Sequence, residues 1–258
     1  MEDNRLYTSQ RRNEILKLLK EQGSISVNQL AEEFQVSGTT IRLDLSALEK
    51  TGLISRTHGG ALLNTQSERE TLIQERKNHA EKERIAQKAV SLIRENDTIL
   101  IDTGTTMLAL AKALAASAIS RLRVYSNDLD VLRVLEEKEN YELHLMGGVI
   151  RNGFHYTAGS RIIAELRDYH FKKMFLATSA ISLESGLTTA NSDLAAMKAA
   201  MIAASEKVIL LTDSSKMHHV LFQRFADLDA VDTLITDSGL EEEDIAELEK
   251  RVGSLLIV

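Results

Sequence analysis

The chain has neither cysteine nor proline among its 258 residues, and aromatic residues make up only 4% of it. The absence of cysteine excludes disulfides and cysteine-based zinc sites, and it is compatible with a reducing compartment. No apolar run reaches the roughly 20 residues that a membrane-spanning helix needs, since the longest candidate, 108–119, is interrupted by Lys112. The first ten residues are polar and show no signal-peptide pattern. We therefore expect a cytoplasmic protein.

The chain also lacks an excess of positive charge. The formal net charge is −7, and the first 60 residues hold eight Lys or Arg and eight Asp or Glu, so the whole excess of negative charge lies after them. Proteins that coat nucleic acid carry a strongly positive surface, which excludes that class here. Any site-specific binding of DNA must be indicated by sequence pattern and not by charge.

Residues 9–51 show three short helical patterns, and a hairpin pattern follows them. Gly23 and Ser26 separate the first two helical patterns and are favourable residues for a helix C-terminus and N-terminus. The segments 53–56 and 61–63 then flank a Thr-His-Gly-Gly turn, which is typical of a short β-hairpin. This part of the chain therefore predicts a small domain of three helices and a hairpin.

From residue 98 onward, short apolar runs alternate with helical patterns. The runs are 98–101, 122–125, 142–146, 174–177, 208–211, 233–236 and 255–258. The helical patterns are 82–94, 107–116, 129–137, 194–205 and 243–251. Strands that are apolar on both faces and alternate with helices favour a mainly parallel sheet covered on both sides. The sequence predicts an α/β fold for this part.

The second and third helical patterns fit a helix-turn-helix, because a three-residue corner joins them and small polar residues lead the second. In such a motif the N-terminal edge of the second helix faces the bases in the major groove. The candidate DNA-binding residues on this edge are Ser37, Thr39, Thr40, Arg42 and Leu43. Threonine binds phosphate or a thymine methyl, and arginine donates to guanine or phosphate. The hairpin, with Arg56 and His58 near its tip, fits the wing of a winged helix. The alternative is a three-helix domain that serves protein contacts alone.

These segments resemble the DeoR/GlpR family of bacterial repressors. The family shows a Ser-x-x-Thr-Ile-Arg-Arg-Asp-Leu signature and an Arg-x-x-Gly-Gly wing, and this chain has Ser-Gly-Thr-Thr-Ile-Arg-Leu-Asp-Leu at 37–45 and Arg-Thr-His-Gly-Gly at 56–60. Leu43 stands where the signature commonly has a second arginine. That exchange removes one donor and offers an apolar contact to a thymine methyl. DNA phosphates would repel Asp44, so we expect it to make a structural hydrogen bond or salt bridge.

Polar clusters follow four of the predicted strands. They are Asp102, Thr103, Gly104, Thr105 and Thr106 after the first, Ser126 and Asn127 after the second, Gly147, Gly148 and Arg151 after the third, and Asp213 and Lys216 after a later one. Ligands of open parallel sheets bind outside the carboxyl ends of the strands. Backbone N–H groups and hydroxyls at a helix N-terminus suit a phosphate, and the remaining amides, cations and carboxylates suit a polyol. We expect a sugar-phosphate site without metal or cofactor, although packing alone explains many Gly- and Thr-rich turns.

The same segments resemble the effector half of the DeoR/GlpR family, so the resemblance covers essentially the whole chain. It implies a domain similar to ribose-5-phosphate isomerase and glucosamine-6-phosphate deaminase, with the Asp-x-Gly-Thr-Thr turn taking the phosphate. The segments 186–189 and 232–237 also fit the family. Lys172-Lys173 and 177–181 depart from it, because the family often has Asp-Lys and Gly-x-x-Gly-Ile there. We expect the two missing glycines to narrow the cleft or to alter which sugar fits.

Together these features predict a winged helix-turn-helix domain at 1–62, a linker at 63–80 and an α/β effector and oligomerisation domain at 81–258. The expected function is a repressor of a carbohydrate-utilisation operon, controlled by a phosphorylated sugar. A winged helix reads only a few base pairs, so we expect a homodimer or homotetramer on double-stranded operator DNA. The alternatives are a sugar-phosphate isomerase or deaminase with an appended DNA-binding domain, and an adaptor that never meets DNA. Neither Asp102 nor Asp213 lies in a recognisable catalytic motif, which favours binding without turnover.

Overall fold

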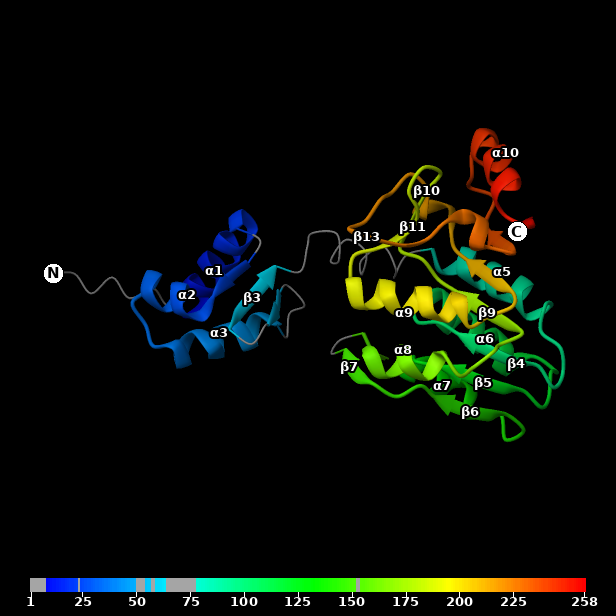
Figure 1. The fold of residues 1–258 in the computed structure, drawn as a ribbon, viewed down its shortest axis with the longest axis horizontal. Coiled ribbons are helices and arrows are strands. Elements are labelled where there is room, and N and C mark those ends of the chain that lie inside the picture. Colours follow the sequence, from blue (N-terminus) through cyan, green and yellow to red (C-terminus); the bar gives the residue numbers. More distant parts are fainter. Residues whose placement is uncertain (1–7, 23, 50–53, 57–58, 64–77, 152–153) are drawn as a thin grey trace. The chain divides into compact units, whose positions relative to one another are not determined.

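The computed structural model describes residues 8–22, 24–49, 54–56, 59–63, 78–151 and 154–258. The chain divides into two compact units, Met1–Leu72 and Ile73–Val258, which we call the N-terminal and C-terminal units (Figure 1). The division lies inside the predicted linker 63–80, and the domain boundaries proposed from the sequence stay predictions. No described helix is long and apolar enough to cross a membrane.

The N-terminal unit contains the predicted three helices and hairpin. Its elements are α1 (Thr8–Gln22), β1 (Ser24–Ser26), α2 (Val27–Glu33), α3 (Gly38–Glu49), β2 (Ile54–Arg56) and β3 (Gly60–Leu63). The strands form an antiparallel sheet in the order β1-β3-β2. Ile15, Leu30 and Leu45, from the three helices, are fully buried and form the centre of the core. This core fixes α3 against the other two helices.

Local sequence determines where α2 begins and how the chain turns from α2 into α3. Ser26 caps α2, because its hydroxyl accepts the Gln29 N–H at 3.2 Å while Gln29 Oε1 accepts the Ser26 N–H at 3.0 Å. After α2 the chain turns through Gln35, which has a left-handed φ of 51°. Such a backbone costs a residue with a Cβ roughly 1 kcal/mol or more. The predicted N-cap is confirmed, and the corner between α2 and α3 is made without glycine.

The carboxylate of Asp44 ties α3 to α1. It accepts hydrogen bonds from Arg11 Nε at 2.6 Å and from Arg12 Nε at 2.9 Å. Asp44 is 1% exposed, and Arg11 is also buried. An ion pair this deep destabilises a protein strongly when one partner is removed, because the other charge stays buried. The expected structural role of Asp44 is confirmed.

We expect Asp44→Asn to lower the free energy of unfolding of the N-terminal unit by about 3 kcal/mol, because Arg11 would lose its carboxylate. The partial exposure of Arg12 keeps the loss near the lower end of the range for buried pairs. Hydrogen exchange of the α3 amides measures this unit by itself. As a control, Glu33→Gln removes an exposed carboxylate from α2 and should change the value by less than about 0.5 kcal/mol. Unaltered exchange in Asp44→Asn would show that the two arginines do not stabilise the unit.

The C-terminal unit is built on a seven-stranded sheet in the order β15-β14-β12-β9-β4-β5-β6, and every neighbouring pair is parallel. Its strands are β4 (Thr98–Ile101), β5 (Arg123–Ser126), β6 (Glu142–Leu145), β9 (Lys173–Leu176), β12 (Val208–Leu211), β14 (Thr233–Thr236) and β15 (Leu255–Ile257). All seven predicted strands are present, with ends that differ by at most one residue. The mainly parallel α/β fold is confirmed.

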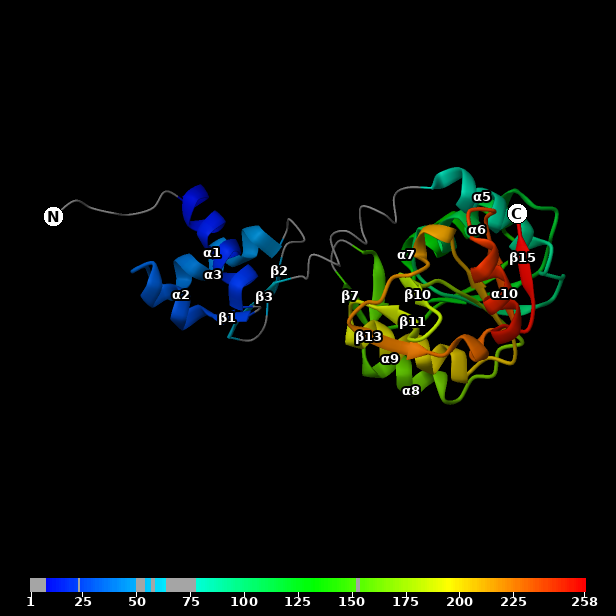
Figure 2. The same cartoon turned by 90° about the horizontal axis from the view of Figure 1, so that it is seen from above.

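Helices cover both faces of this sheet (Figures 1 and 2). The helices are α5 (His79–Val90), α6 (Thr105–Ala116), α7 (Leu129–Leu135), α8 (Ser160–Leu166), α9 (Ser192–Ala203) and α10 (Glu242–Arg251). Alternate residues of β4 enter different cores: Ile99 and Ile101 pack with α5, α6 and α7, whereas Leu100 packs with α8, α9 and α10. Burial on both faces explains why the strands are continuous apolar runs.

Smaller elements, which the sequence did not predict, lie beside the sheet. They are the β7–β8 hairpin (Val149–Arg151 and Tyr156–Ala158), the antiparallel sheet of β10 (Ala180–Ser182), β11 (Gly186–Thr189) and β13 (Gln223–Ala226), and the short helices η1 (Ser214–Lys216) and η2 (Leu228–Ala230). β7 and β8 pair as a local hairpin, as do β10 and β11. β13 pairs with β11 from a distant part of the chain, and such a contact leaves no local signal in the sequence.

The strand order reverses between β4 and β9. From β4 the chain adds β5 and β6 on one side, then returns to place β9, β12, β14 and β15 on the other. The loops that leave β4 and β9 therefore diverge, and a crevice at such a switch point is the usual ligand site of an open parallel sheet. The fold thus directs attention to the residues that follow β4, β5, β9 and β12.

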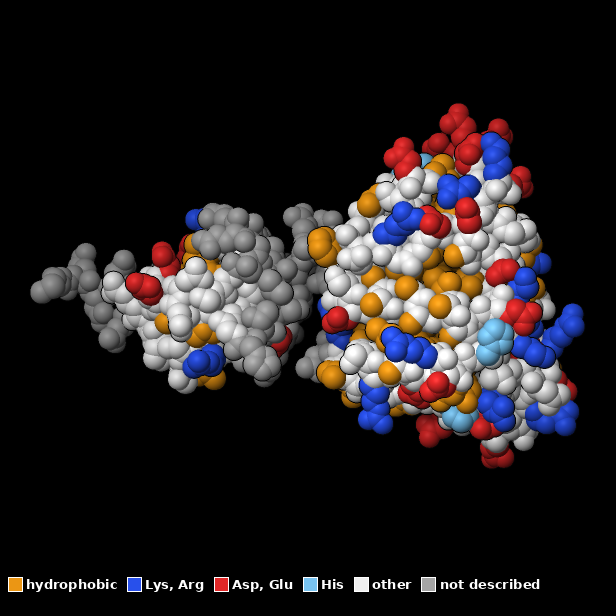
Figure 3. All heavy atoms as spheres, viewed as in Figure 1, with side chains coloured by type: hydrophobic (Ala, Val, Ile, Leu, Met, Phe, Trp, Pro, Cys, Tyr) orange, Lys and Arg blue, Asp and Glu red, His pale blue; other side chains and the backbone are white. Residues whose placement is uncertain are grey.

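The outer face of α9 has no charge between its ends. Ala196, Ala199 and Ala203 are exposed, and hydrophobic side chains lie over this helix in Figure 3, with charged ones around it. Asp193 and Lys198 are the charged residues of α9, and Lys198 is only 3% exposed. The helix therefore directs its positive charge inward, toward the sheet.

Candidate effector site and DNA-binding helix

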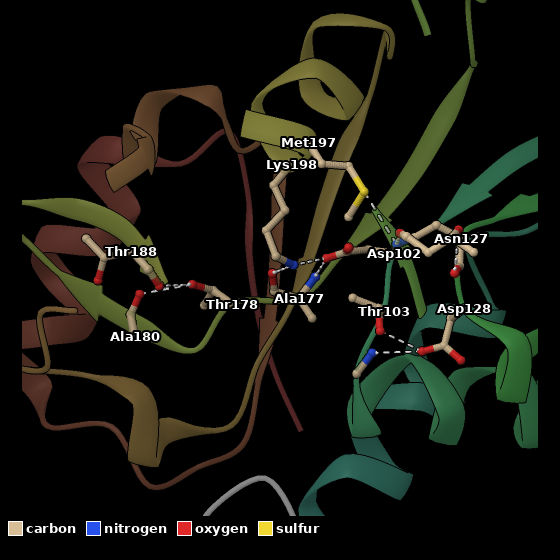
Figure 4. Close-up of polar contacts among 12 residues, drawn as sticks. Asp102, Thr103, Asn127, Asp128, Ala177, Thr178, Ala180, Thr188, Met197 and Lys198 are labelled. Carbon is tan, nitrogen blue, oxygen red and sulfur yellow. Dashed lines mark hydrogen bonds and ion pairs between the residues drawn. The ribbon is translucent and has the colours of Figure 1, made fainter. Parts of the chain in front are cut away.

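A buried ion pair lies at the switch point between β4 and β9 (Figure 4). Asp102 follows β4, and Lys198 extends from α9 to donate to Asp102 Oδ2 and to the carbonyl of Ala177, the latter at 2.9 Å. The N–H of Ala177, which follows β9, donates to the same carboxylate oxygen at 3.0 Å. The pair joins the ends of both strands to α9. Lys198 was not among the site residues predicted from the sequence. Its position on the apolar face of a helix, three residues from Met201, was the sequence feature that indicated its burial.

Asp128 is a second buried carboxylate that was not predicted. Its Oδ2 accepts from the Thr103 hydroxyl at 2.7 Å and the Gly104 N–H at 3.3 Å, and its Oδ1 caps α7 by accepting the N–H groups of Asp130 and Val131. Burial raises the pKa of Asp128 above its ordinary value, and these hydrogen bonds oppose the rise. Asp128 fixes the turn after β4 against α7. The proton of the Thr103 hydroxyl is committed to this bond.

The Gly-Thr-Thr turn begins α6, as predicted. Gly104 is the N-cap residue with a φ of 124°, which residues with a Cβ rarely adopt. An added Cβ would meet only the Ala177 Cβ at 3.9 Å, so backbone conformation, and not crowding, requires glycine. Thr106 is buried and Thr105 is half-buried. The first N–H groups of a helix lack intrahelical partners, so this turn can present them to an anion.

Ser126 and Asn127, at the end of β5, are fully buried. Ser126 Oγ accepts the N–H of Asp128 at 3.0 Å, and Asn127 Nδ2 donates to the carbonyl of Thr157 at 2.9 Å. The hydroxyl of Thr157, in β8, donates to the carbonyl of Met146 at 2.6 Å. These bonds fasten the β7–β8 hairpin to the ends of β5 and β6, beside the switch point.

Gly147 and Gly148 connect β6 to this hairpin. A Cβ on Gly148 would lie 2.6 Å from the carbonyl oxygen of Ala158, whereas one on Gly147 would meet no atom within 4 Å. Gly148 is therefore needed for the close approach of the hairpin strands. Arg151 ends β7 and holds its guanidinium 5.0 Å from the centre of the Phe154 ring, a cation–π distance. Its contact with a ligand stays a prediction.

Asp213 follows β12, and Lys216 ends the short helix η1 after it. They are 1% and 3% exposed. Asp213 Oδ1 accepts from Asn78 Nδ2 at 2.8 Å and from the Ser215 hydroxyl. The sequence placed both residues at the carboxyl edge of the sheet, and they lie there, but it gave no signal for the contact with Asn78.

Five buried side-chain atoms have no hydrogen-bond partner in the part of the chain that the structure describes. They are Asp102 Oδ1, Asn127 Oδ1, Asp213 Oδ2, Lys216 Nζ and Thr236 Oγ1. Each belongs to a residue at the carboxyl end of β4, β5, β12 or β14, or in η1 directly after β12. Buried polar atoms are nearly always hydrogen-bonded, and leaving one unsatisfied costs about 1–3 kcal/mol. Their shared position makes this edge the candidate binding site. Among the described residues, no three His, Cys, Asp or Glu side chains lie close enough together to hold a metal ion.

The candidate DNA-binding residues surround the start of α3. Ser37 precedes the helix and accepts the Thr40 N–H at 3.2 Å, with the two hydroxyls 2.9 Å apart. Thr39 and Arg42 are exposed, and Leu43 has 66% of its surface exposed. Leu43 is therefore accessible for contact with DNA, although a single exposed apolar side chain is not by itself evidence of a partner. Of the predicted wing residues, His58 and the side chain of Arg56 lie outside the described part of the chain.

Family models match both units. A DeoR-like helix-turn-helix domain matches residues 11–67, and a DeoR C terminal sensor domain matches residues 77–238. The chain resembles the ribose 5 phosphate isomerase A of Neisseria gonorrhoeae over 53% of its length and 52% of that chain, with a TM-score of 0.39 and 18% identity. At that score the likeness supports no conclusion about function.

Three curated relatives match nearly the whole chain. The HTH-type transcriptional repressor GlcR of Bacillus subtilis is 34% identical over 98% of this chain and 97% of its own length. The HTH-type transcriptional regulator GlpR of Haloferax volcanii is 34% identical over 95% of both. The lactose phosphotransferase system repressor of Lactococcus lactis is 36% identical over 92% of this chain and 94% of its own length. The chain belongs to the DeoR family of transcriptional regulators, with a helix-turn-helix domain followed by a sensor domain.

Proposed function

We propose that this regulator represses a carbohydrate-utilisation operon and that a phosphorylated sugar, bound at the carboxyl edge of the sheet, controls its binding to DNA. The five unpartnered buried atoms at that edge are the observation that carries the ligand site. Two of the relatives described above are named repressors, one of them of a lactose phosphotransferase system. Those names support both repression and a carbohydrate target.

Four of the five unpartnered atoms divide into two chemical groups. Asp102, Asn127 and Asp213 each offer an acceptor, and sugar hydroxyls are donors that satisfy acceptors. Lys216 offers an ammonium group, and the start of α6 offers backbone N–H groups, which together suit a phosphate. A phosphorylated sugar suits both groups, whereas free phosphate offers too few donors for the acceptors and a free sugar brings no negative charge to the ammonium group.

The proposed site also includes the other predicted residues around this edge. They are Thr103, Gly104, Thr105, Thr106, Ser126, Gly147, Gly148 and Arg151. Within this set, Gly104 is the residue whose backbone conformation is tied most closely to presenting the N–H groups of α6.

We infer that the site binds its ligand without turnover, because a shared fold does not carry catalysis with it. In the alternative, a sugar-phosphate isomerase or deaminase, Asp102 would be the base, with one oxygen held by Lys198 and the other unpartnered. A base must reach a carbon-bound proton of the ligand. Steady conversion of a bound sugar phosphate, lost in Asp102→Asn, would establish that alternative.

We infer that Thr39, Thr40, Arg42 and Leu43 enter the major groove of operator DNA, with Ser37 at the start of the helix. Arg56 and His58 of the wing then lie near the DNA backbone. Two or four copies, joined through the C-terminal unit as a homodimer or homotetramer, would place paired helices on paired half-sites. The expected location is the cytoplasm, where the operator is.

Lys216→Ala should weaken binding of a sugar phosphate roughly ten- to hundredfold, because a charge-assisted hydrogen bond contributes about 1.5–3 kcal/mol. Thermal shift and calorimetry with glucose 6-phosphate, glucosamine 6-phosphate and ribose 5-phosphate measure this. Lys207→Ala is the matched control, since Lys207 lies at the other end of β12 and is 57% exposed. The free sugars should bind the parent as weakly as their phosphates bind Lys216→Ala. Equal affinity of parent and Lys216→Ala for every phosphate that binds would refute the phosphate site.

Arg42→Ala should reduce affinity for operator DNA by about 1–3 kcal/mol, because one bidentate contact to a base would be lost. DNA selected by the parent protein from a random pool serves as the operator in a gel-shift assay. Lys112→Ala removes an equal charge from the exposed surface of α6 and should leave that affinity unaltered. If Arg42→Ala bound the selected DNA as tightly as the parent, α3 would not be the helix that contacts the bases.

A further inference from the structure

The side chain of Asn78, the residue before α5, does not cap that helix, although asparagine at this position usually does. Asn78 is the N-cap residue of α5, yet it makes no side-chain cap bond, and its backbone is left-handed with φ 60° and ψ 44°. Asparagine at an N-cap ordinarily accepts an N–H of the first helical turn. Asparagine tolerates a left-handed conformation better than most residues with a Cβ, but an N-cap residue ordinarily has an extended backbone. Both the missing cap bond and the backbone conformation are therefore unusual for this position, which directs attention to the tertiary contact of the side chain.

That contact leads to the candidate effector site. Asn78 Nδ2 donates to Asp213 Oδ1 at 2.8 Å and to the Ser215 hydroxyl oxygen at 3.2 Å. The other oxygen of Asp213, Oδ2, is buried and has no partner among the described residues. One carboxylate therefore binds Asn78 with one oxygen and offers its second oxygen to a ligand.

Asn78 is also the first residue of the C-terminal unit that the structure describes. The matched helix-turn-helix domain ends at residue 67 and the matched sensor domain begins at residue 77. The covalent path from the DNA-binding helix therefore arrives at Asn78. Its carbonyl accepts the N–H of Lys82 at 3.1 Å, so the conformation of this residue also sets the first turn of α5.

We propose that Asn78 is the positioning residue that couples the effector site to the segment leading to the DNA-binding domain. The identity of the ligand rests on the function proposed above, but the contact itself does not. A ligand hydroxyl that donates to Asp213 Oδ2 draws negative charge toward that oxygen. It thereby weakens the hydrogen bond that Asp213 Oδ1 accepts from Asn78. A ligand shifts a conformational equilibrium only through such a difference in contacts between two states.

The coupling is tested first without ligand or DNA, by hydrogen exchange at the Lys82 amide in the full chain. Asn78→Gly keeps the left-handed backbone but removes the side-chain bonds, and it should speed this exchange roughly tenfold, since the lost bond is to a charged group. Asp213→Ala should do the same, and the double variant should exchange no faster than either single variant. Ser215→Ala alters only an exposed hydroxyl and should give a smaller increase that vanishes in the Asn78→Gly background. Additive effects of these changes, or unaltered exchange at Lys82, would overturn the proposal.

The second measurement is the affinity for operator DNA with and without a probe ligand. The probe is whichever of glucose 6-phosphate, glucosamine 6-phosphate and ribose 5-phosphate binds the parent most tightly. Asn78→Gly should bind this probe within about threefold of the parent, while the effect of the probe on operator affinity falls at least roughly tenfold. Asn96→Gly is the matched control, because Asn96 is an exposed asparagine with a φ of 65° in the turn before β4. An unaltered effect of the probe in Asn78→Gly would exclude this role of Asn78. Failure of all three phosphates to bind would contradict the proposed function, and the exchange at Lys82 would still decide the coupling.

Discussion

Burial of charge at one edge of the sheet is the constraint on which the rest of the C-terminal unit depends. Asp102, Asp128 and Asp213 are each at least 95% buried, and a carboxylate is removed from water only where donors replace its hydration. Lys198 supplies a charge to the first, the turn at Gly104 supplies an N–H to the second, and Asn78 supplies an amide to the third. Each donor comes from a different segment. The carboxylates therefore hold α9, α6 and the entrance to α5 in place through the hydrogen bonds that they accept.

The reversal of strand order explains why this edge, and not the opposite one, collects such groups. At the carboxyl ends of parallel strands the backbone N–H groups of following helices point inward, so negative charge is favourable there. The compensation is incomplete, because each of the three residues Asp102, Asn127 and Asp213 keeps an unsatisfied acceptor. A site that is almost neutralised is stable enough to fold and still gains free energy when a ligand supplies the missing donors.

Sequence patterns could predict whatever depends on neighbours along the chain. The seven parallel strands, the start of α6 at the Gly-Thr-Thr turn and the cap at Ser26 are all of this kind, because apolar runs and helix boundaries leave local signals. The polar residues after β4, β5 and β12 followed from the sheet rule. Lys198, Asp128 and Asn78 could not be predicted, since their roles depend on contacts 96, 24 or 25, and 135 residues away along the chain. The apolar face of α9 is a local signal for burial of Lys198, but the local pattern does not identify its partner, Asp102.

The neutral charge of the first 60 residues affects how control of DNA binding can work. Contacts with phosphate dominate non-specific affinity, and a unit with no net charge gains little from them, so operator binding must depend on a few directed donors such as Arg42. In the proposed homodimer or homotetramer, each copy would then bind weakly, and useful affinity would come from two copies acting together. Linking two sites raises affinity by roughly 10²–10⁴-fold, and that gain is lost when the geometry forbids simultaneous contact. Under the coupling proposed for Asn78, where the connecting segment enters the sensor domain, a small change would therefore be sufficient for a large change in operator occupancy. It would need to alter only the spacing of two weak binding units and not the fold of either.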